Sequence, residues 1–462
     1  MHILYKEKGI YMNATAIVLA AGAGTRMKSD KPKVAHEILG KPLVRWVVDA
    51  VRGAGLEDVV AVVGHKRDQV EPLLADAKVV VQEEQLGTAH AVQQAKEAVE
   101  GTSGSVVVLT GDSPLVTSET IAKLVSLREE SDAGVVVLTM IADDPTGYGR
   151  IVRDEDGQVL AIVEQKDATP EQLAITECNS GFYCFDAKLL FGALEEVSTD
   201  NAQGEYYLTD VLSIARERGR EVLALVADDS GECLGVNSRR QLAEATALLR
   251  DRINRKHMDA GVTLWDPSTT WIGPDVEIEQ DVEILPQTML LGSTKVATGC
   301  VVGPNTRLAD TVVGPRCVID ETVAIEATLD EDVECGPRAY LRPATHMCAG
   351  SKAGTHVEIK KSTIGAGSKV PHLSYIGDCT MGSGVNIGAG SITCNYDGKA
   401  KWPTVIEDDV FVGSDTMMVA PVTLGRHCLV AAGSVVTKDA SPESLVLGRA
   451  RQVEKEGWNK GK

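Results

Sequence analysis

His372 is the side chain of this sequence best suited to removing a proton near neutral pH, because imidazole titrates close to that range. It lies in the segment Pro371-His372-Leu373-Ser374-Tyr375. Arg342 and Lys360, a short distance upstream, could hold a phosphate. Other polar residues accompany it at short range: Tyr375, Asn386, Asn395 and Tyr396. A lone histidine is more often structural than catalytic, so a structural role stays open.

A glycine-rich turn near the start of the chain directly follows a predicted buried strand at residues 15–19. The turn reads Ala20-Ala21-Gly22-Ala23-Gly24-Thr25-Arg26. Small residues let backbone N–H groups approach phosphates, so a strand that runs into such a turn suits nucleotide binding. Arg26 and Lys33 could neutralise a polyphosphate, although surface charge is the usual fate of such residues. No GK[ST] ends the turn, so it is not a Walker motif.

Asp112 follows another predicted buried strand, at residues 106–109. Predicted strands and helices alternate from residue 14 to residue 238, which indicates a parallel sheet in an α/β, Rossmann-like, nucleotide-binding domain. Ligands of such sheets bind beyond the carboxyl ends of the strands, where we also expect the glycine-rich turn and Gly87-Thr88. An aspartate at this place can hold a hard cation against a phosphate. The alternative for Asp112 is an Asx turn before Pro114.

The second half of the chain repeats an aliphatic residue every six positions. This period fits neither an α-helix nor a plain alternating strand, and it is typical of a solenoid of short strands. An ordinary glycine-rich β-domain is the alternative, which irregular spacing would favour. The residues in the repeat are Ile272, Ile278, Ile284, Leu290, Val296, Val302 and Leu308, then Ile364, Val370 and Ile376, then Val412, Met418, Leu424, Val430 and Val436.

Four segments follow from these patterns. Residues 1–13 form an N-terminal extension, residues 14–238 the α/β domain, and residues 239–262 a linker helix. Ser238 is a plausible N-cap of that helix, and Gly261 a residue that ends it. Residues 263–462 form the solenoid with a C-terminal tail. The repeat breaks at residues 338–361 and 393–403, and insertions in a solenoid are often functional.

Composition excludes several classes of protein. The chain has 462 residues and a formal net charge of −20, which argues against general binding to nucleic acids or anionic membranes. The longest apolar run falls short of the roughly 18 residues that a membrane span needs, and no secretion signal is visible. The 10 cysteines are scattered without a CxxC pair, so we expect them reduced in a cytoplasmic protein without structural zinc.

Several separated motifs of the first half resemble the sugar-1-phosphate nucleotidyltransferase family. They occur in order over residues 14–238, beginning with "LAAGAGTRM" and continuing through "QEEQLGTAH", "LTGDSPL", "TGYGR", "VEQK", "CNSG" and "GVN". The resemblance implies that a nucleoside triphosphate binds on the glycine-rich turn. A sugar phosphate then attacks the α-phosphorus and releases pyrophosphate.

The order of both halves resembles a bacterial family of bifunctional enzymes that make UDP-N-acetylglucosamine. The second half is similar to the left-handed β-helix of the hexapeptide acyltransferase superfamily, and its motifs are "LRP", "VEIKKS", "HLSYIGD", "VNIGAGSITCNYDG", "VFVGSDTMMVAPV" and "KEGW". The resemblance implies acetyl transfer from acetyl-CoA to glucosamine-1-phosphate, followed by uridylyl transfer from UTP to N-acetylglucosamine-1-phosphate. The product would feed peptidoglycan and lipopolysaccharide precursors.

The first resemblance also implies roles for individual residues. Gly22 and Gly24 would bind the nucleotide with the adjoining backbone, Arg26 and Lys33 would neutralise phosphates, and Asp112 and Asn237 would hold Mg²⁺. The full set implied to bind the nucleotide or UDP-N-acetylglucosamine is Leu19, Ala20, Ala21, Gly22, Arg26, Lys33, Gln82, Gly87, Thr88, Gly111, Asp112, Gly149, Glu164, Asn179 and Asn237. Within it, Gln82, Gly87 and Thr88 would read the uracil, and Gly149, Glu164 and Asn179 would hold the sugar.

For the second half, the resemblance implies that His372 is the general base for the 2-amino group. The residues implied to bind the sugar phosphate are Arg342, Lys360, Tyr375 and Asn386. Those implied to bind acetyl-CoA are Ala389, Asn395, Tyr396, Ser414, Ala432 and Arg449. The family's homotrimer would build this second site between subunits.

The sequence departs from the family pattern at three places and leaves other functions open. Thr355-His356 stands where Asn-Phe is expected, Thr110 where an aromatic residue is common, and Ala344 where glycine is usual. The alternatives are a chain with one working half, a non-enzymatic trimeric platform, and a nucleotidyltransferase for another pyrimidine triphosphate such as dTTP.

Overall fold

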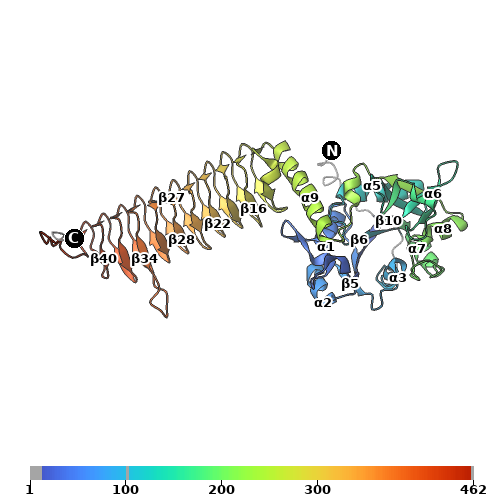
Figure 1. Cartoon of the computed structure of the whole chain (residues 1–462), viewed down its shortest axis with the longest axis horizontal. Helices are drawn as coiled ribbons and strands as arrows, with labels where there is room; N and C mark the ends of the chain where they lie inside the picture. The colour runs from blue at the N-terminus through green and yellow to red at the C-terminus, as the bar shows by residue number, and fades with distance from the viewer. Residues whose placement is uncertain (1–12, 100–103, 459–462) are drawn as a thin grey trace. The chain divides into compact units, whose positions relative to one another are not determined.

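The computed structural model of the chain describes residues 13–99 and 104–458 (Figure 1). It divides into two compact units, Met1–Leu249 and Arg250–Lys462. Of the predicted N-terminal extension, residues 1–12 lie outside the described residues. The domain boundaries proposed above stay a prediction.

The N-terminal unit is built on one twisted sheet, and most residues of its strands β1, β4 and β6 are buried. Its strands, in spatial order, are β11 (Val222–Val226), β7 (Val135–Ile141), β10 (Glu177–Asp186), β6 (Ser105–Thr110), β1 (Ala14–Ala20), β4 (Val59–Val63) and β5 (Lys78–Val81), with β8 (Arg150–Arg153) and β9 (Val159–Val163) attached beside β10. The sheet is parallel except at β10, which runs antiparallel to β6 and β7, and in the β8–β9 hairpin. The predicted parallel sheet is therefore mixed, because the chain re-enters it from a hairpin rather than from a crossover helix.

Helices cover both faces of this sheet. They are α1 (Leu43–Gly53), α2 (Arg67–Val70), α3 (Thr88–Gln93), α4 (Lys96–Val99), α5 (Ser118–Ser131), α6 (Pro170–Leu173), α7 (Ala187–Leu194) and α8 (Asp210–Glu217), and a two-stranded ribbon of β2 (Glu37–Ile38) and β3 (Lys41–Pro42) precedes α1. Helix α1 packs against the sheet through one apolar face. Its buried residues on this face recur at helical spacing and are Val44, Val47, Val48 and Val51.

The C-terminal unit is a β-helix with three walls, each a parallel sheet. The first wall contains β12 (Thr263–Leu264), β15 (Glu283–Ile284), β18 (Val301–Val302), β21 (Val318–Ile319), β24 (Glu334–Cys335), β27 (Lys352–Thr355), β30 (Lys369–His372), β33 (Asn386–Ile387), β36 (Phe411–Val412), β39 (Leu429–Val430) and β41 (Leu445–Val446). The second contains β13 (Trp271–Ile272), β16 (Met289–Leu291), β19 (Arg307–Ala309), β22 (Val323–Ile325), β25 (Tyr340–Leu341), β28 (Glu358–Lys360), β31 (Tyr375–Gly377), β34 (Ile392–Cys394), β37 (Met417–Val419) and β40 (Val435–Val436). The third contains β14 (Glu277–Ile278), β17 (Lys295–Val296), β20 (Val312–Val313), β23 (Thr328–Leu329), β26 (His346–Met347), β29 (Thr363–Ile364), β32 (Cys379–Met381), β35 (Thr404–Ile406) and β38 (Val422–Leu424).

The six-residue repeat places one aliphatic side chain of each short strand inside the β-helix. Every residue of the predicted repeat is buried except Ile278, which is half-buried and packs against the same core. The repeat shifts phase after Leu308 because the coils differ in length. Arg307 pairs with Met289, eighteen residues earlier, whereas Val323 pairs with Arg307 after only sixteen.

Helix α9 (Arg239–Asp259) joins the two halves of the sequence, as the spacing predicts. Its first turn is capped by the Ser238 hydroxyl, which accepts the Gln241 N–H at 3.3 Å. Gly261 ends the helix with a φ of +95°. In the C-terminal unit, the buried Asn254 amide donates to the carbonyls of Pro267 and Thr270 at 2.9 and 3.0 Å, which fixes this part of the helix to the first coil.

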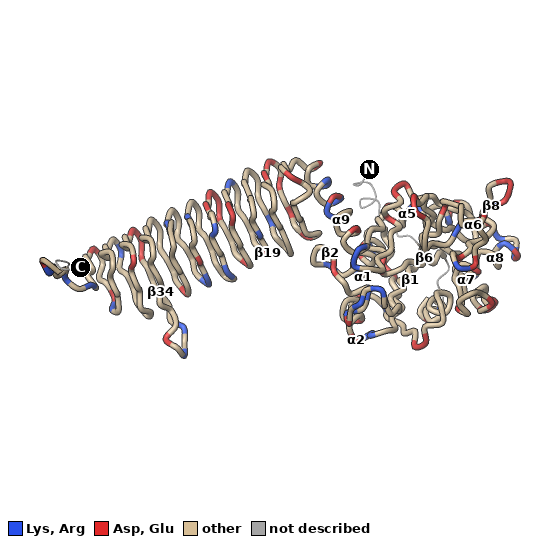
Figure 2. Tube along the Cα trace, viewed as in Figure 1, with Lys and Arg blue, Asp and Glu red and all other residues tan. Residues whose placement is uncertain are grey.

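All ten cysteines are free thiols. Over residues 13–99 and 104–458, helices long and apolar enough to cross a membrane are absent. Acidic and basic residues are interspersed along the turns of the β-helix (Figure 2).

Ala344 occupies one of the left-handed turns of the β-helix, with a φ of +60°. This conformation costs a residue with a Cβ about 1–2 kcal/mol, whereas a glycine costs about 0.5–1 kcal/mol in lost chain entropy. We therefore expect Ala344→Gly to stabilise the protein by roughly 0.5–1 kcal/mol, measured by chemical denaturation followed by circular dichroism. Ala349 lies in a neighbouring turn but does not have a positive φ, so Ala349→Gly should destabilise the protein by a similar amount. Equal signs for the two variants would contradict this explanation.

Candidate functional site

In the N-terminal unit, the ends of β1 and β6 bring the glycine-rich turn close to Asp112. The Lys33 ammonium group donates to Asn237 Oδ1 at 2.8 Å and forms a short ion pair with Asp112 Oδ2. The side chains of Lys33 and Asp112 are only 16% and 14% exposed. The two predicted metal ligands therefore direct oxygen atoms at the same positively charged atom.

Backbone contacts hold this arrangement in place. The Gly111 N–H donates to the Leu19 carbonyl at 2.9 Å, and the Asp112 carbonyl accepts the Val236 N–H at 2.8 Å. Gly24 has a φ of +62°, and a Cβ at this position would lie 2.5 Å from Lys33 Cβ. Only glycine lets the turn pass this close to Lys33. The position of the Lys33 side chain therefore depends on the glycine at position 24.

Asp112 and Asn237 supply two oxygen donors of the kind that a divalent cation such as Mg²⁺ prefers. Their side-chain oxygens are hard donors that converge on one cationic centre, which in this structure is the Lys33 ammonium nitrogen. The ammonium group therefore supplies positive charge at the point where the two oxygen atoms converge. A bound metal ion would lie beside the ammonium group or replace it there.

The predicted uracil-reading residues lie together between β5 and α3. The buried Gln82 amide donates to the Gly87 carbonyl at 3.2 Å and contacts His90 Nδ1 at 3.1 Å. The Thr88 hydroxyl accepts the Leu208 N–H at 3.0 Å. Gly87 has a φ of +120°, and any Cβ there would lie 2.5 Å from the Tyr206 carbonyl oxygen. These contacts fix the loop that presents the three residues.

Gly149, directly before β8, and Glu164, directly after β9, also come together with Asn179 of β10. A Cβ on Gly149 would lie 3.4 Å from Glu164 Oε1 and 3.6 Å from Asn179 Cβ, so the glycine leaves open space beside both side chains. Asn179 donates to the hydroxyl of the buried Tyr183 at 2.7 Å. Burial raises the pKa of Glu164 above 4.5, and the nearby carboxylates of Asp167 and Asp210 raise it further.

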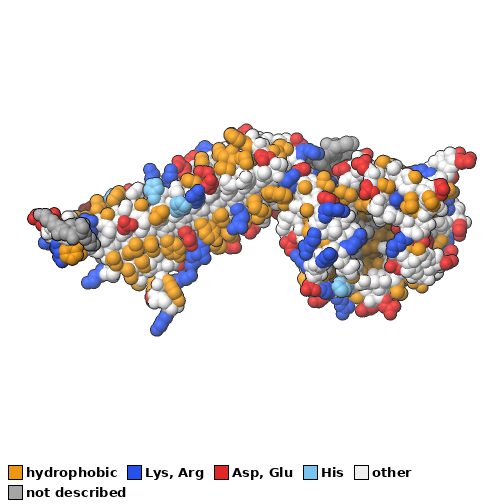
Figure 3. Space-filling model, in the orientation of Figure 1, with side chains coloured by type: hydrophobic (Ala, Val, Ile, Leu, Met, Phe, Trp, Pro, Cys, Tyr) orange, Lys and Arg blue, Asp and Glu red, His pale blue; other side chains and the backbone are white. Residues whose placement is uncertain are grey.

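The remaining predicted residues of this unit lie around the turn. Leu19 and Ala20 end β1, Ala21 and Gly22 begin the turn, and Arg26 is exposed on a short 3-10 helix (Thr25–Met27). The space-filling view shows a hollow in this unit with Lys and Arg side chains along one side (Figure 3). Gln85 also belongs to this region, since its amide donates to the Ala21 carbonyl at 3.0 Å. Neither Gln85 nor Tyr183 is among the predicted residues.

In the C-terminal unit, His372 ends β30 at the corner between the first and second walls. Its side chain is exposed, and the exposed Leu373 follows in a left-handed turn with a φ of +48°. The turn is fixed by the Leu373 N–H, which donates to the Thr355 carbonyl at 2.9 Å, and by the Ser374 hydroxyl, which donates to the His372 carbonyl at 2.7 Å. A structural role inside the β-helix core is therefore excluded for this histidine.

A polar cluster forms where the strands of the second wall end, with Lys360 the last residue of β28, Asp378 directly after β31 and Asn395 directly after β34. Asp378 accepts the Asn395 amide at 2.6 Å and lies 3.5 Å from Lys360 Nζ and 3.7 Å from Lys361 Nζ. Asn395 is buried, and its amide lies 3.5 Å from the Tyr375 hydroxyl. Sequence reasoning left Asp378 out, although it stands in the quoted motif "HLSYIGD".

Arg342 directly follows β25, a strand of the same wall. Leu341 pairs with Ile359, so Arg342 is in register with Lys360 on the next coil. Its guanidinium group donates to Glu358 at 2.9 Å and stands 6.0 Å from the centre of the Tyr340 ring. Two cations on neighbouring coils can face one phosphate, provided that Glu358 gives up its hydrogen bond.

Three of the six predicted acetyl-CoA residues, Ala389, Ser414 and Ala432, lie in line with His372. Lys369 pairs with Asn386, Asn386 with Phe411, and Phe411 with Leu429. Three residues further along each coil stand His372, Ala389, Ser414 and Ala432. Backbone bonds continue this line, because the Asp415 N–H donates to the Ala389 carbonyl at 2.7 Å and the Gly433 N–H to the Ser414 carbonyl at 2.8 Å.

Arg449, Asn386 and Tyr396 lie around this line. The Arg449 guanidinium group donates to the Ala432 carbonyl at 3.0 Å. Asn386 is on the coil next to His372 but three positions before the point opposite it. Tyr396 is 60% exposed on the loop that projects from the β-helix after β34 (Figure 1). The base of this loop is closed by the Trp402 N–H, which donates to the Asn395 carbonyl at 2.8 Å.

Comparison with known proteins agrees with both halves of the structure. The family model of the MobA-like NTP transferase domain matches residues 16–263, and that of the hexapeptide repeat of succinyl-transferase matches residues 403–438. The bifunctional protein GlmU of Heliobacterium modesticaldum is 51% identical over 96% of this chain and 97% of its own length. The chain belongs to the GlmU family.

Two further members of the GlmU family show the same extent of similarity. GlmU of Exiguobacterium sp. is 48% identical over 97% of this chain and all of its own length, and GlmU of Carboxydothermus hydrogenoformans is 50% identical over 96% and 99%. The predicted family is thereby confirmed. The predicted fold class is confirmed too, as a nucleotidyltransferase domain followed by a left-handed parallel β-helix of hexapeptide repeats.

The raised pKa of Glu164 gives a prediction for this GlmU family member. The folded protein favours the protonated carboxyl, so Glu164 contributes its full stability below pH 4.5 and loses it as pH rises through the folded pKa. We expect Glu164→Gln to unfold at a higher temperature than the parent at pH 7–8. The difference should vanish near pH 4, where both side chains are neutral. Thermal unfolding across this pH range measures it, and a lower unfolding temperature of the variant at pH 7 would contradict the assignment.

Proposed function

We propose that this protein is a bifunctional transferase of UDP-N-acetylglucosamine synthesis. It transfers an acetyl group from acetyl-CoA to glucosamine-1-phosphate, and then a uridylyl group from UTP to N-acetylglucosamine-1-phosphate with release of pyrophosphate. The observation that carries the proposal is the occurrence in one chain of two polar clusters. Asp112, Asn237 and Lys33 meet beside the glycine-rich turn, and an exposed His372 lies in the same β-helix as Arg342 and Lys360, which are in register on neighbouring coils of the second wall.

In the acetyl-transfer site, His372 takes a proton from the 2-amino group of glucosamine-1-phosphate. The amine nitrogen then forms a bond to the thioester carbonyl carbon, and the carbon–sulfur bond breaks. Coenzyme A leaves with the electron pair of that bond and is protonated. Lys360 and Arg342 hold the phosphate of the sugar, assisted by Tyr375 and Asn386.

The line of positions from Ala389 through Ser414 to Ala432 fits the path of acetyl-CoA. Small side chains at these positions leave the outer face of successive coils open to an extended ligand, and Arg449 follows at the end of the line. Asn395 and Tyr396 close the site from the projecting loop. Asn395 polarises the thioester oxygen once its amide is released from Asp378.

In the uridylyl-transfer site, a phosphate oxygen of the sugar attacks the α-phosphorus of UTP, and pyrophosphate leaves. Asp112 and Asn237 would hold Mg²⁺, which when bound neutralises charge on the phosphates. Lys33 and Arg26 stabilise negative charge, and Gly111 and the turn from Leu19 to Gly24 carry the phosphates. Gln82, Gly87 and Thr88 orient the uracil, while Gly149, Glu164 and Asn179 orient the sugar. Most of the rate enhancement comes from positioning and electrostatics.

The active protein is a cytoplasmic homotrimer in this proposal, with the acetyl-transfer site built between subunits. Three exposed apolar side chains stack in register on the first wall: Phe411, Leu429 and Leu445, which are 47%, 44% and 63% exposed. Hydrophobic side chains also gather on the β-helix beside the base of the projecting loop (Figure 3). A patch of this kind favours association, and a neighbouring subunit would enclose the exposed His372. The product supplies precursors of peptidoglycan and lipopolysaccharide.

Asp112→Ala tests the first activity. Removing the carboxylate takes away a ligand of the cation that the transferred phosphate needs, so Mg²⁺-dependent pyrophosphate release from UTP and N-acetylglucosamine-1-phosphate should fall by at least about 10²-fold. Release of free coenzyme A from acetyl-CoA and glucosamine-1-phosphate should persist. Asp58→Ala, an exposed aspartate before β4 at the opposite edge of the sheet, is the matched control and should retain both activities. Full pyrophosphate release by the Asp112 variant would refute the role.

His372→Ala tests the second activity. Loss of a general base should lower acetyl transfer by roughly 10²–10⁴-fold while uridylyl transfer persists. The control is His427→Ala, which removes an exposed histidine of the β-helix whose side chain is 52% exposed. Following thiol release and pyrophosphate release separately in one assay with all substrates distinguishes the outcomes. An equal loss of both activities would mean misfolding, and an unchanged acetyl transfer would remove His372 from the mechanism.

A further inference from the structure

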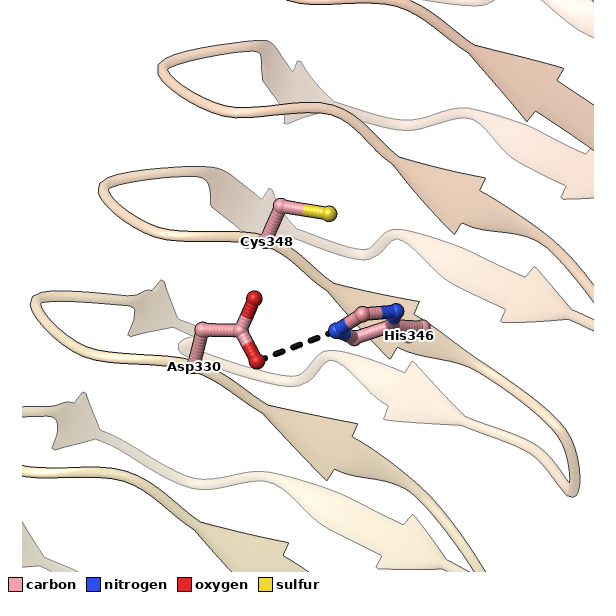
Figure 4. A group of neighbouring side chains, drawn as sticks. All are labelled: Asp330, His346 and Cys348. Carbon is pink, nitrogen blue, oxygen red and sulfur yellow. Dashed lines mark hydrogen bonds and ion pairs between the residues drawn. The ribbon is translucent and has the colours of Figure 1, made fainter.

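Three different potential metal ligands meet on the third wall of the β-helix. Asp330, His346 and Cys348 each offer one donor atom, and these atoms all lie within 4.8 Å of one another. His346 Nε2 is 3.0 Å from Asp330 Oδ1. Figure 4 shows the imidazole facing the carboxylate, with the sulfur of Cys348 on the same side of the coils. This cluster belongs to neither of the two sites described above.

The register of the third wall creates the cluster. Leu329 pairs with Met347, so Asp330 and Cys348, the next residues, stand opposite each other on adjacent coils. His346 precedes Cys348 by two positions, and side chains two apart in a strand point to the same face. The inward residues Leu329 and Met347 are buried, which leaves all three donors on the outer face. A backbone bond of 2.9 Å from the Asp330 N–H to the Met347 carbonyl joins these two coils, and one of 2.9 Å from the Cys348 N–H to the Ile364 carbonyl joins the second to the following coil.

The neighbouring coils leave room for an ion. Gly314 stands in register with Asp330 on the preceding coil, and Gly365 in register with Cys348 on the following coil. Neither residue has a side chain that could cover the donors. Each of the three ligand residues is half-buried, so the cluster is open to solvent on one side and supported by the β-helix on the other.

The donor set selects the class of metal. An imidazole nitrogen, a thiolate sulfur and a carboxylate oxygen suit a borderline ion such as Zn²⁺, whereas Mg²⁺ and Ca²⁺ prefer oxygen ligands alone. In a tetrahedral zinc site with bonds of about 2.0–2.3 Å, neighbouring donors are roughly 3.3–3.6 Å apart. The Nε2–Oδ1 distance of 3.0 Å is close to that value, so small side-chain rotations suffice.

We propose that Asp330, His346 and Cys348 form a binding site for a zinc-class divalent ion, with water as the fourth ligand. The ion links the coil that carries Asp330 to the coil that carries His346 and Cys348, and it stabilises the folded β-helix because the unfolded chain lacks the preformed site.

Titration of the full-length protein with Co²⁺ tests the proposal. The protein is first freed of metal with a chelator and then kept in excess Mg²⁺, which occupies the oxygen ligands of the N-terminal unit. A cobalt–thiolate bond gives a charge-transfer band in the near ultraviolet that oxygen ligands do not give. We expect one equivalent of Co²⁺ to produce this band, and one equivalent of Zn²⁺ to remove it and raise the unfolding temperature.

Variants separate this site from adventitious binding. Cys348→Ser should abolish the band, and Asp330→Asn and His346→Gln should weaken binding by at least about tenfold. Cys394→Ser is the matched control, because Cys394 is the other cysteine of intermediate exposure among the described residues, and it should leave the band unchanged. Circular dichroism of each variant verifies folding. The proposal is overturned if the parent gives no band, if the band survives in Cys348→Ser, or if neither Asp330→Asn nor His346→Gln changes the affinity.

Discussion

The backbone register between successive coils is the constraint on which the C-terminal half depends. Each coil donates its N–H groups to the coil beside it, so a residue is fixed opposite partners sixteen to eighteen positions away where no loop intervenes. The core has little influence on which outward side chains become neighbours, because it is filled by one aliphatic side chain per strand. Register therefore decides which outward side chains become neighbours. It aligns His372 with Ala389, Ser414 and Ala432, and it also places Asp330 opposite Cys348.

The N-terminal unit brings its polar groups together at the ends of neighbouring strands. The carboxyl ends of β1 and β6 lie side by side, so the glycine-rich turn and Asp112 meet although about ninety residues separate them in the sequence. Lys33 then draws Asp112 and Asn237 together through its ammonium group. A carboxylate fixed beside a cation is oriented before any substrate arrives, which is the arrangement that electrostatic catalysis requires.

At the left-handed turns of the β-helix, the backbone conformation that a residue prefers differs from the one that the fold imposes. Ala344, His356 and Leu373 all have positive φ values near +50° to +60°, although each carries a Cβ. The ladder of the β-helix imposes these conformations at its corners, and the strain is offset by the backbone bonds on either side. Two of the three departures from the family pattern, Ala344 and His356, fall at such corners. The third, Thr110, ends β6, where its hydroxyl lies 2.9 Å from the Ser113 hydroxyl.

The sequence by itself determined the two architectures, because hydrophobic periodicity and glycine-rich turns are local signals that the core must satisfy. It also supplied most of the residues of both candidate sites, through ordered motifs that only resemblance could interpret. The antiparallel β10, the contacts of Asp378 with Asn395 and Lys360, the shared partner Lys33 of Asp112 and Asn237, and the cluster of Asp330, His346 and Cys348 were decided by the tertiary structure alone. Each depends on which distant residues come into register, and pairing across coils or strands is set by packing of the whole chain rather than by any local pattern.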